Sequence, residues 1–327
     1  MQLGWIDFSK TERNKIMSVL DLLSQDSTLD ELGIAPVRDG FANLFFPGTS
    51  TIQTRAKYFF LVAYELKDLE LTDDTYPNRI LSTLNELERQ CGEILLSQNK
   101  AESGIIGERS IKNGKWVKRI PADIYWAGLR KYHIFTGGNM SLSEYVRASC
   151  VLKKQKATLA ELGNRNDSTD DNVGDDKNAG NLFKKQFWNM PLYNNEWINE
   201  LCITLTKEEG LFLKEQIIRT CPNTMLSYIL KNDMVSVLNC DTFKDLSMFS
   251  TEFPYEIQVD YRLALEFSDF LYIIRTLYNI MVSDGQNEYA NEEFIRLQTE
   301  MQDKAKIDIN LILIKLGITN SPLKSFL

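Results

Sequence analysis

A hydroxyl-rich stretch, Phe46–Phe60 (FPGTSTIQTRAKYFF), holds side chains that could bind a phosphate group. A Pro-Gly turn comes first and aromatic residues follow, so a helix is expected to begin near Ser50. Free backbone N–H groups and the positive end of the helix dipole attract an anion at such a place, and an arginine can hold it with two hydrogen bonds. The candidate phosphate-binding residues are Thr49, Ser50, Thr51 and Arg55.

A simpler interpretation of this stretch needs no ligand. It lacks the G-x-x-x-x-G-K-[ST] scaffold of a nucleotide-binding loop. The hydroxyl groups would then serve a turn and a helix cap, and Arg55 would pair inside the fold with a carboxylate such as Asp39 or Asp7. The residue chemistry favours this structural interpretation.

A second candidate is the basic and aromatic segment Ile105–His133, in which Glu108 and Asp123 are the only acidic residues. Such a mixture can neutralise phosphates while aromatic rings stack on exposed bases. The alternative is a solvated hairpin whose cations point outward, with Trp126 and Tyr125 in the core. The candidate nucleic-acid-binding residues of this segment are Arg109, Lys112, Lys115, Trp116, Lys118 and Arg119, and Arg130, Lys131, Tyr125, Trp126 and Tyr132 accompany them.

Other chemistry finds little support in the residue types. The five cysteines include no CxxC pair, and His133 is the only histidine, so a zinc site or imidazole catalysis is not expected. The carboxylates that could form a nuclease-type metal centre, Asp7, Asp30, Glu31 and Asp39, follow no metal-binding motif. We therefore predict no catalytic residue, no metal and no cofactor.

Charge is distributed unevenly along the chain. The net charge is -8, but residues 1–156 carry 21 Lys and Arg against 19 Asp and Glu, whereas residues 157–327 carry 16 against 26. An anionic partner would therefore meet the first half. No apolar run approaches the length that spans a bilayer, and the N-terminal residues lack the pattern of a signal peptide, so a cytoplasmic protein is expected.

The elements that position these residues are expected to be mainly α-helical. Apolar residues recur at helical spacing, and three S/T-x-x-E capping boxes mark helix starts at Ser9, Ser141 and Thr206. The expected helices include residues 10–23, 36–46, 50–66, 77–98 and 257–282, with further helices after Pro121 and after the second and third capping boxes.

One segment departs from this helical pattern. Asn113-Gly114 is a strong signal for a β-hairpin, because both central residues of a type I′ turn need positive φ. We expect short strands at Ser110–Lys112 and Lys115–Val117.

The chain is long enough for two domains. Residues 157–181 are rich in Asn, Asp and Gly and have few large apolar side chains, which is typical of a solvated linker or loop. The expected organisation is an N-terminal domain of residues 1–156 with a hairpin near 110–117, an acidic linker of residues 157–181, and an acidic helical domain of residues 182–327.

Three blocks carry a resemblance to a known family: LGWIDFS at Leu3–Ser9, the segment Asp30–Phe60, and PADIYWAGL at Pro121–Leu129. They resemble an uncharacterised bacterial family of domains of unknown function, marked by LGWIDFS and FPGTSTIQTRA(R/K)YF. This chain departs from the family pattern with Lys57 in place of Arg and Ala122 in place of Ser. The resemblance implies no established activity. It implies an association with anti-phage defence loci, in which helicase-like and phospholipase-D-like proteins would be partners.

Three functions follow as hypotheses. The first is a non-catalytic component of a defence complex, whose N-terminal domain contacts DNA or another nucleic acid, or a helicase-like partner. The second is an enzyme that holds a phosphate at Thr49–Arg55 with Asp7 and Asp39 nearby. The third is a scaffold that binds only proteins.

Overall fold

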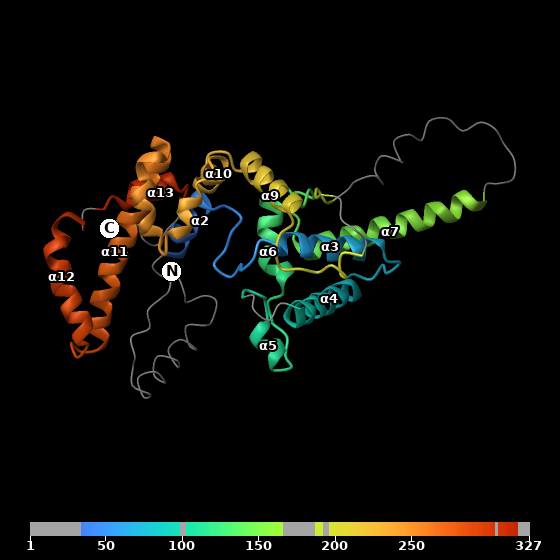
Figure 1. Ribbon diagram of the computed structural model, residues 1–327, viewed down its shortest axis with the longest axis horizontal. Helices are drawn as coiled ribbons and strands as arrows, with labels where there is room; N and C mark the ends of the chain where they lie inside the picture. The colour runs from blue at the N-terminus through green and yellow to red at the C-terminus, as the bar shows by residue number, and fades with distance from the viewer. Residues whose placement is uncertain (1–33, 99–102, 166–186, 192–195, 305–306, 320–327) are drawn as a thin grey trace. The chain divides into compact units, whose positions relative to one another are not determined.

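The computed structural model describes residues 34–98, 103–165, 187–191, 196–304 and 307–319 (Figure 1). These residues are predominantly helical, which confirms the prediction of a mainly α protein. Extended pairing among them is limited to one isolated antiparallel bridge, between Phe135 and Trp188. The helix expected at residues 10–23 lies outside the described residues, as does most of the expected linker.

Contacts divide the chain into two compact units. Unit 2 is Phe46–Asn223, and unit 1 combines Met1–Phe45 with Thr224–Leu327. This grouping differs from the division expected from composition, because residues 187–191 and 196–223 belong with the N-terminal helices. The first part of the expected linker, residues 157–165, continues helix α7.

The described helices of unit 2 are α3 (Tyr58–Leu71), α4 (Pro77–Gln98), α5 (Glu108–Lys112), α6 (Pro121–Lys131), α7 (Leu142–Arg165) and α9 (Lys207–Thr220). Helix α3 packs against α4 and α6, and α4 also packs against α7. Every residue from Tyr58 to Leu66 is buried, because α3 is covered on several sides. A helix that is apolar around its circumference is typical of such a central position.

The capping boxes expected in unit 2 are present at both places. The carboxylate of Glu144 accepts hydrogen bonds from the backbone N–H and the hydroxyl of Ser141, at 2.7 and 2.8 Å. Thr206 and Glu209 form the reciprocal pair at the start of α9, with N–H to oxygen distances of 2.8 and 3.2 Å. Local sequence therefore sets the first turns of α7 and α9.

The described helices of unit 1 are α2 (Ile34–Phe45), α10 (Met225–Lys231), α11 (Tyr255–Val282), α12 (Glu288–Lys304) and α13 (Ile309–Lys315), with 3₁₀ helices at Val235–Asn239 and Phe243–Glu252. Helices α11 and α12 pack along each other as a hairpin (Figure 1). The ring of Phe41 on α2 lies 6.1 Å from that of Phe267 on α11. The ring of Phe45 lies 5.4 Å from that of Phe243. These aromatic contacts join the N-terminal and C-terminal parts of unit 1.

No helix among the described residues is both long enough and apolar enough to cross a membrane.

Candidate nucleic-acid interface

The phosphate-binding candidates of the first stretch lie in a loop before α3, and not at its first turn. Helix α3 begins at Tyr58, so the expected start near Ser50 is wrong. The Thr49 hydroxyl donates to the carbonyl of Phe46 at 2.7 Å and closes a turn. Ser50 and Thr51 are exposed. These hydroxyl residues therefore do not cap the helix, and anion binding by them stays a prediction.

A tyrosine on α6 holds the end of this loop. The hydroxyl of Tyr125 accepts hydrogen bonds from the backbone N–H groups of Thr54 and Arg55, at 2.9 and 3.1 Å. The same hydroxyl donates to the carbonyl of Arg55 at 2.8 Å. Since these N–H groups already have an acceptor, they are not available to cradle a phosphate.

The side chain of Arg55 lies half-buried against the loop that leads to α5. Its Nε donates to the carbonyl of Ser103 at 2.8 Å, and the neighbouring Thr54 hydroxyl donates to the carbonyl of Gly104 at 2.6 Å. Asp39, one of the two expected partners, pairs with Arg38 at 2.8 Å, and Asp7 lies outside the described residues. Arg55 thus joins two loops through a backbone carbonyl.

The predicted β-hairpin at residues 110–117 is wrong, because this segment forms the short helix α5 and its C-terminal cap. The N–H of Lys115 donates to the carbonyl of Ser110 at 2.8 Å, and the N–H of Gly114 donates to that of Ile111 at 2.9 Å. Gly114 has φ of 66°. This pair of bonds around a left-handed glycine is a Schellman motif, so Asn113-Gly114 ends a helix.

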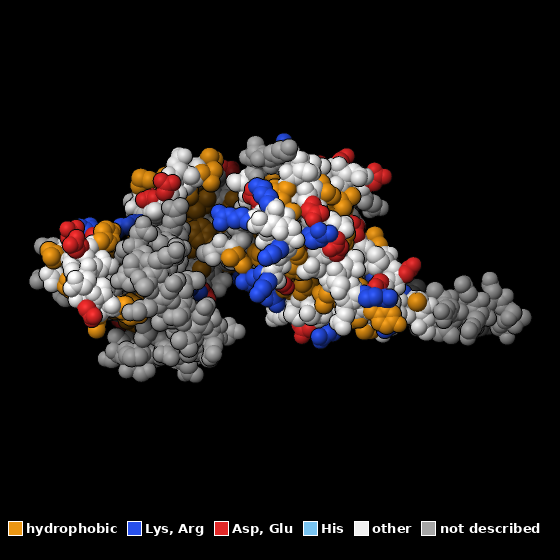
Figure 2. Space-filling model, turned by 90° about the horizontal axis from the view of Figure 1, so that it is seen from below, with side chains coloured by type: hydrophobic (Ala, Val, Ile, Leu, Met, Phe, Trp, Pro, Cys, Tyr) orange, Lys and Arg blue, Asp and Glu red, His pale blue; other side chains and the backbone are white. Residues whose placement is uncertain are grey.

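The cations of this segment form a patch that we call the α5 basic surface. All five are exposed, and Figure 2 shows Lys and Arg side chains gathered on the side of the molecule where α5 lies. One of them, Lys112, pairs with Glu108 at 2.6 Å on the same helix. The members of the surface are Arg109, Lys112, Lys115, Lys118 and Arg119.

Trp116 lies beneath this surface and fixes α5 on its neighbours. A Cβ atom at Gly107 would lie 2.7 Å from Cζ3 of Trp116, and one at Gly92 on α4 would lie 3.4 Å from the same atom. The ring is half-buried against both glycines. Its placement excludes a side chain at Gly107, whereas at Gly92 the obstacle is Cδ1 of Ile111, 2.9 Å from an added Cβ atom. Stacking of Trp116 on a base stays a prediction.

The structure brings the two candidate segments next to each other. Ser103 and Gly104 bond to the first segment, and the N–H of Ile106 donates to the Tyr58 hydroxyl at 2.9 Å. The chain then enters α5 directly through Gly107. The loop before α3 therefore holds the residues that lead into α5 and its basic surface.

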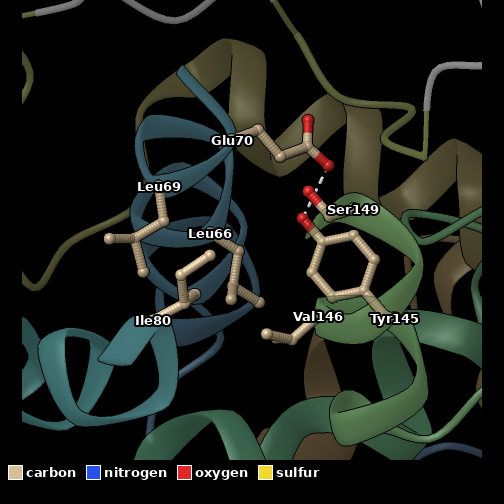
Figure 3. Close-up of a pocket in the computed structure, with 7 residues that line it drawn as sticks. All are labelled: Leu66, Leu69, Glu70, Ile80, Tyr145, Val146 and Ser149. Carbon is tan, nitrogen blue, oxygen red and sulfur yellow. Dashed lines mark hydrogen bonds between the residues drawn. The ribbon is translucent and has the colours of Figure 1, made fainter. Parts of the chain in front are cut away.

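A small cavity in unit 2 is lined by residues of α3, α4 and α7 (Figure 3). Its volume is about 10 Å³, which is enough for about one water molecule. The Tyr145 hydroxyl donates to Oε1 of Glu70 at 2.6 Å, and the indole N–H of Trp188 donates to the same atom at 3.2 Å. Burial raises the pKa of the Glu70 carboxyl, and these two bonds oppose the rise. The cavity is too small for an organic ligand.

Within the parts of the chain that the structure describes, no group of His, Cys, Asp and Glu side chains could hold a metal ion.

Sequence reasoning missed the buried charges of unit 2. Nζ of Lys57 lies 2.7 Å from both carboxylate oxygens of Glu209, and the Tyr64 hydroxyl donates to Oε1 at 2.9 Å. Glu209 was identified only as the third helical residue of a capping box. Its second role depends on a partner 152 positions away, for which the sequence contains no local signal.

Comparison with known proteins finds a match only for the N-terminal part of the chain. A family of unknown function, DUF6361, matches residues 1–157. No curated protein and no solved structure matches the chain. The match ends within α7, whereas unit 2 is completed by later residues such as Trp188, Trp197 and Glu209. The similarity brings no assigned activity with it.

Proposed function

We propose that this protein is a non-catalytic component that contacts nucleic acid through the α5 basic surface. The observation that carries the proposal is the density of exposed positive charge. Five exposed cations lie between Arg109 and Arg119, and Glu108 is the only acidic residue in the sequence from Ile105 to Arg119. The resemblance noted above suggests the setting, an anti-phage defence complex with helicase-like or phospholipase-D-like partners.

The chain's overall charge limits this contact to places where cations are locally in excess. A protein with net charge -8 is repelled by a polyanion at most of its surface, so binding depends on the local excess of cations. Each phosphate that a lysine or arginine neutralises releases condensed counterions, and this release makes the affinity depend steeply on salt. A scaffold that binds only proteins would lack this dependence.

The test compares two triple charge reversals in the whole chain. The variant Lys112→Glu/Lys115→Glu/Lys118→Glu removes three cations of the surface. A matched control, Lys156→Glu/Lys207→Glu/Lys231→Glu, changes three lysines that are exposed elsewhere and alters the net charge equally. Affinity for a fluorescein-labelled DNA oligonucleotide is measured by anisotropy across a salt series.

We expect the first variant to lose most of its affinity and to reduce the salt slope by about 2 to 3, with a smaller change in the control. Equal affinities and equal salt slopes in the two variants would contradict the proposed surface. Absence of binding by the unmodified chain, to DNA and to RNA of the same length, would favour the scaffold.

A further inference from the structure

A second cationic and aromatic surface lies where α4 begins beside α7. It is an open groove of about 580 Å³, within the range of small-molecule sites. Arg147 is exposed on α7, and Tyr76 immediately precedes α4. We call this the Tyr76 groove, and its lining residues are Tyr76, Pro77, Asn78, Arg79 and Arg147.

The ring at the centre of this groove is exposed and fixed in place. Tyr76 keeps 59% of its surface accessible, so its ring is open to a ligand. Its backbone N–H donates to Oδ1 of Asp74 at 2.9 Å. The guanidinium carbon of Arg79 lies 4.4 Å from the ring centroid, and the same Asp74 oxygen accepts from Arg79 at 3.0 Å. One carboxylate therefore holds both the tyrosine backbone and the arginine.

Two further cations reach this pair from α7. Nζ of Lys154 lies 5.5 Å from the centroid of the Tyr76 ring. Arg147 lies seven residues before Lys154 on α7, so the two side chains leave the same side of that helix. The charge of Arg79 is balanced by Asp74, whereas Arg147 and Lys154 supply the positive charge for an anion.

Lys153, which precedes Lys154 on α7, has a structural role. Its ammonium group donates to the carbonyls of Leu69 and Asp74, at 2.6 and 3.1 Å, and to the hydroxyl of Thr72 at 3.2 Å. These bonds tie α7 to the turn that precedes Tyr76. The groove is therefore built by fixed backbone on one side and by a helix face on the other.

From this arrangement we propose that the Tyr76 groove binds one nucleotide of a single strand. The base stacks on the exposed ring of Tyr76 with the Arg79 guanidinium beside it, and the adjoining phosphate contacts Arg147 and Lys154. Aromatic rings and guanidinium planes are the usual platforms for an unstacked base. A base inside a duplex has both faces covered by its neighbours, so the groove selects single-stranded nucleic acid.

This inference rests on the proposed function and makes it more specific. The α5 basic surface offers cations to a phosphate backbone, which single strands and duplexes share. Its aromatic residue, Trp116, is packed against Gly92 and Gly107. Selection between the two forms is therefore assigned to the Tyr76 groove.

The experiment measures affinity for a labelled 20-nucleotide oligo(dT) and for a duplex of equal length at one salt concentration. The test variant is Tyr76→Ala in the whole chain, and Tyr76→Phe preserves the stacking ring. Tyr289→Ala is the matched control, because Tyr289 is 60% exposed and lies on α12 in unit 1. Melting temperatures of all variants confirm that the fold is intact.

We expect Tyr76→Ala to weaken binding to oligo(dT) by about 5-fold to 150-fold, the usual contribution of one stacked base. Binding to the duplex should change less than twofold, and Tyr76→Phe and Tyr289→Ala should behave as the unmodified chain. An unchanged affinity of Tyr76→Ala for oligo(dT) would overturn the inference.

Failure of the inference can be separated from failure of the proposed function. If the unmodified chain binds the duplex as tightly as oligo(dT), and the triple charge reversal at α5 abolishes both, the proposed function stands and the groove is wrong. If the unmodified chain binds neither, both are wrong. If the α5 reversal weakens both forms and Tyr76→Ala weakens only oligo(dT), both are supported.

Discussion

Among the described residues of unit 2, two lysine–glutamate ion pairs have nearly the same length and very different surroundings. The distance from Nζ to the carboxylate is 2.7 Å in Lys57–Glu209 and 2.6 Å in Lys112–Glu108. The side chains of the first pair are 8% and 5% exposed, and those of the second are 64% and 36% exposed. Distance alone therefore says little about what an ion pair contributes.

Burial decides the role of each pair. Removing one partner of a buried pair leaves an uncompensated charge in a poorly solvated place, whereas water replaces a lost partner at the surface. Lys57–Glu209 also joins α3, within the residues matched by the family of unknown function, to α9, which lies beyond them. The buried pair joins two helices of unit 2, and the exposed pair lies within the single short helix α5.

The largest expected effect comes from breaking the buried pair. Lys57→Met should lower the free energy of unfolding by about 3 to 5 kcal/mol, because Glu209 stays buried without its cation. Lys112→Met, the matched change in the exposed pair, should alter it by less than about 0.5 kcal/mol. Urea unfolding followed by tryptophan fluorescence measures both variants, since Trp116, Trp126, Trp188 and Trp197 all lie in unit 2.

A double variant tests whether the unpaired charge causes the loss. In Lys57→Met/Glu209→Leu neither charge remains, so part of the stability should return, less the contribution of the cap that Glu209 provides to α9. If both single lysine variants lose the same stability, burial does not distinguish the two pairs.

Unit 2 also buries two carboxyl groups that are not paired with a cation among the described residues. Glu65 on α3 and Glu88 on α4 are buried, and Oε2 of each has no hydrogen-bond partner among the described residues. Oε1 of Glu88 accepts from the N–H of Ala122 at 2.6 Å, at the start of α6. Burial raises the pKa of Glu65 to about 8; a hydrogen bond from Cys91 opposes the rise, and the charge of Asp68 adds to it. Glu65 is therefore held in its protonated form near neutral pH.

The pKa of Glu88 changes in the same direction. Burial raises it, and the charges of Glu65 and of Asp123 add to the rise, while the Ala122 bond opposes it. The neighbouring Tyr58 and Cys91 also have raised pKa values, chiefly because of burial, so they stay neutral. None of these described neighbours supplies a positive charge, so a proton neutralises the buried carboxyl here, whereas Lys57 neutralises Glu209.

The pH dependence of unfolding tests whether Glu65 is neutralised by a proton. The folded-state pKa of Glu65 lies above its unfolded value of 4.5, so its contribution to stability is complete below about pH 4.5. That contribution is lost as the pH rises toward about 8, at up to about 1.4 kcal/mol per pH unit. Glu65→Gln, which keeps the shape without the charge, should gain stability relative to the unmodified chain across this window.

The measurement is the difference in unfolding free energy between the variant and the unmodified chain from pH 5 to pH 8. Glu215→Gln is the control, because Glu215 is exposed on α9 and its removal should give a nearly constant difference. A constant difference for Glu65→Gln would mean that Glu65 is charged in the folded protein throughout.

Sequence patterns predicted those elements whose signals are local. The bounds expected for α4, residues 77–98, are those observed, because its apolar stripe and its first proline both lie within the helix. The capping boxes before α7 and α9 are confirmed for the same reason. The start of α3 was wrong because the hydroxyl of Tyr125, 70 positions from Arg55, binds the backbone that would otherwise continue the helix.

The candidate site, too, was predicted only in part from the sequence. The exposure of the α5 cations follows from their residue types and was expected. The helix that carries them was not, since Asn-Gly suits both a type I′ turn and a helix end. Both need positive φ at the glycine, and only the hairpin needs it at the asparagine as well. Asn113 has φ of -100°, which identifies the helix end.

The smallest expected effect distinguishes a helix end from a hairpin at residues 113 and 114, next to the exposed Lys112–Glu108 pair. Gly114→Ala should cost about 1 kcal/mol, because an alanine at positive φ is strained although no described atom lies within 4 Å of the added Cβ. Asn113→Ala should cost less than about 0.5 kcal/mol, since it loses only an exposed hydrogen bond to the carbonyl of Arg109. In a type I′ hairpin both substitutions would be strained to a similar degree, so equal losses would favour the hairpin.

Gly210→Ala is the control for the glycine change. Gly210 lies within α9 with the same open surroundings, and alanine there should stabilise the helix by about 0.5 to 1 kcal/mol. Opposite signs at Gly114 and Gly210, with little change at Asn113, would show that the basic surface is carried by a capped helix.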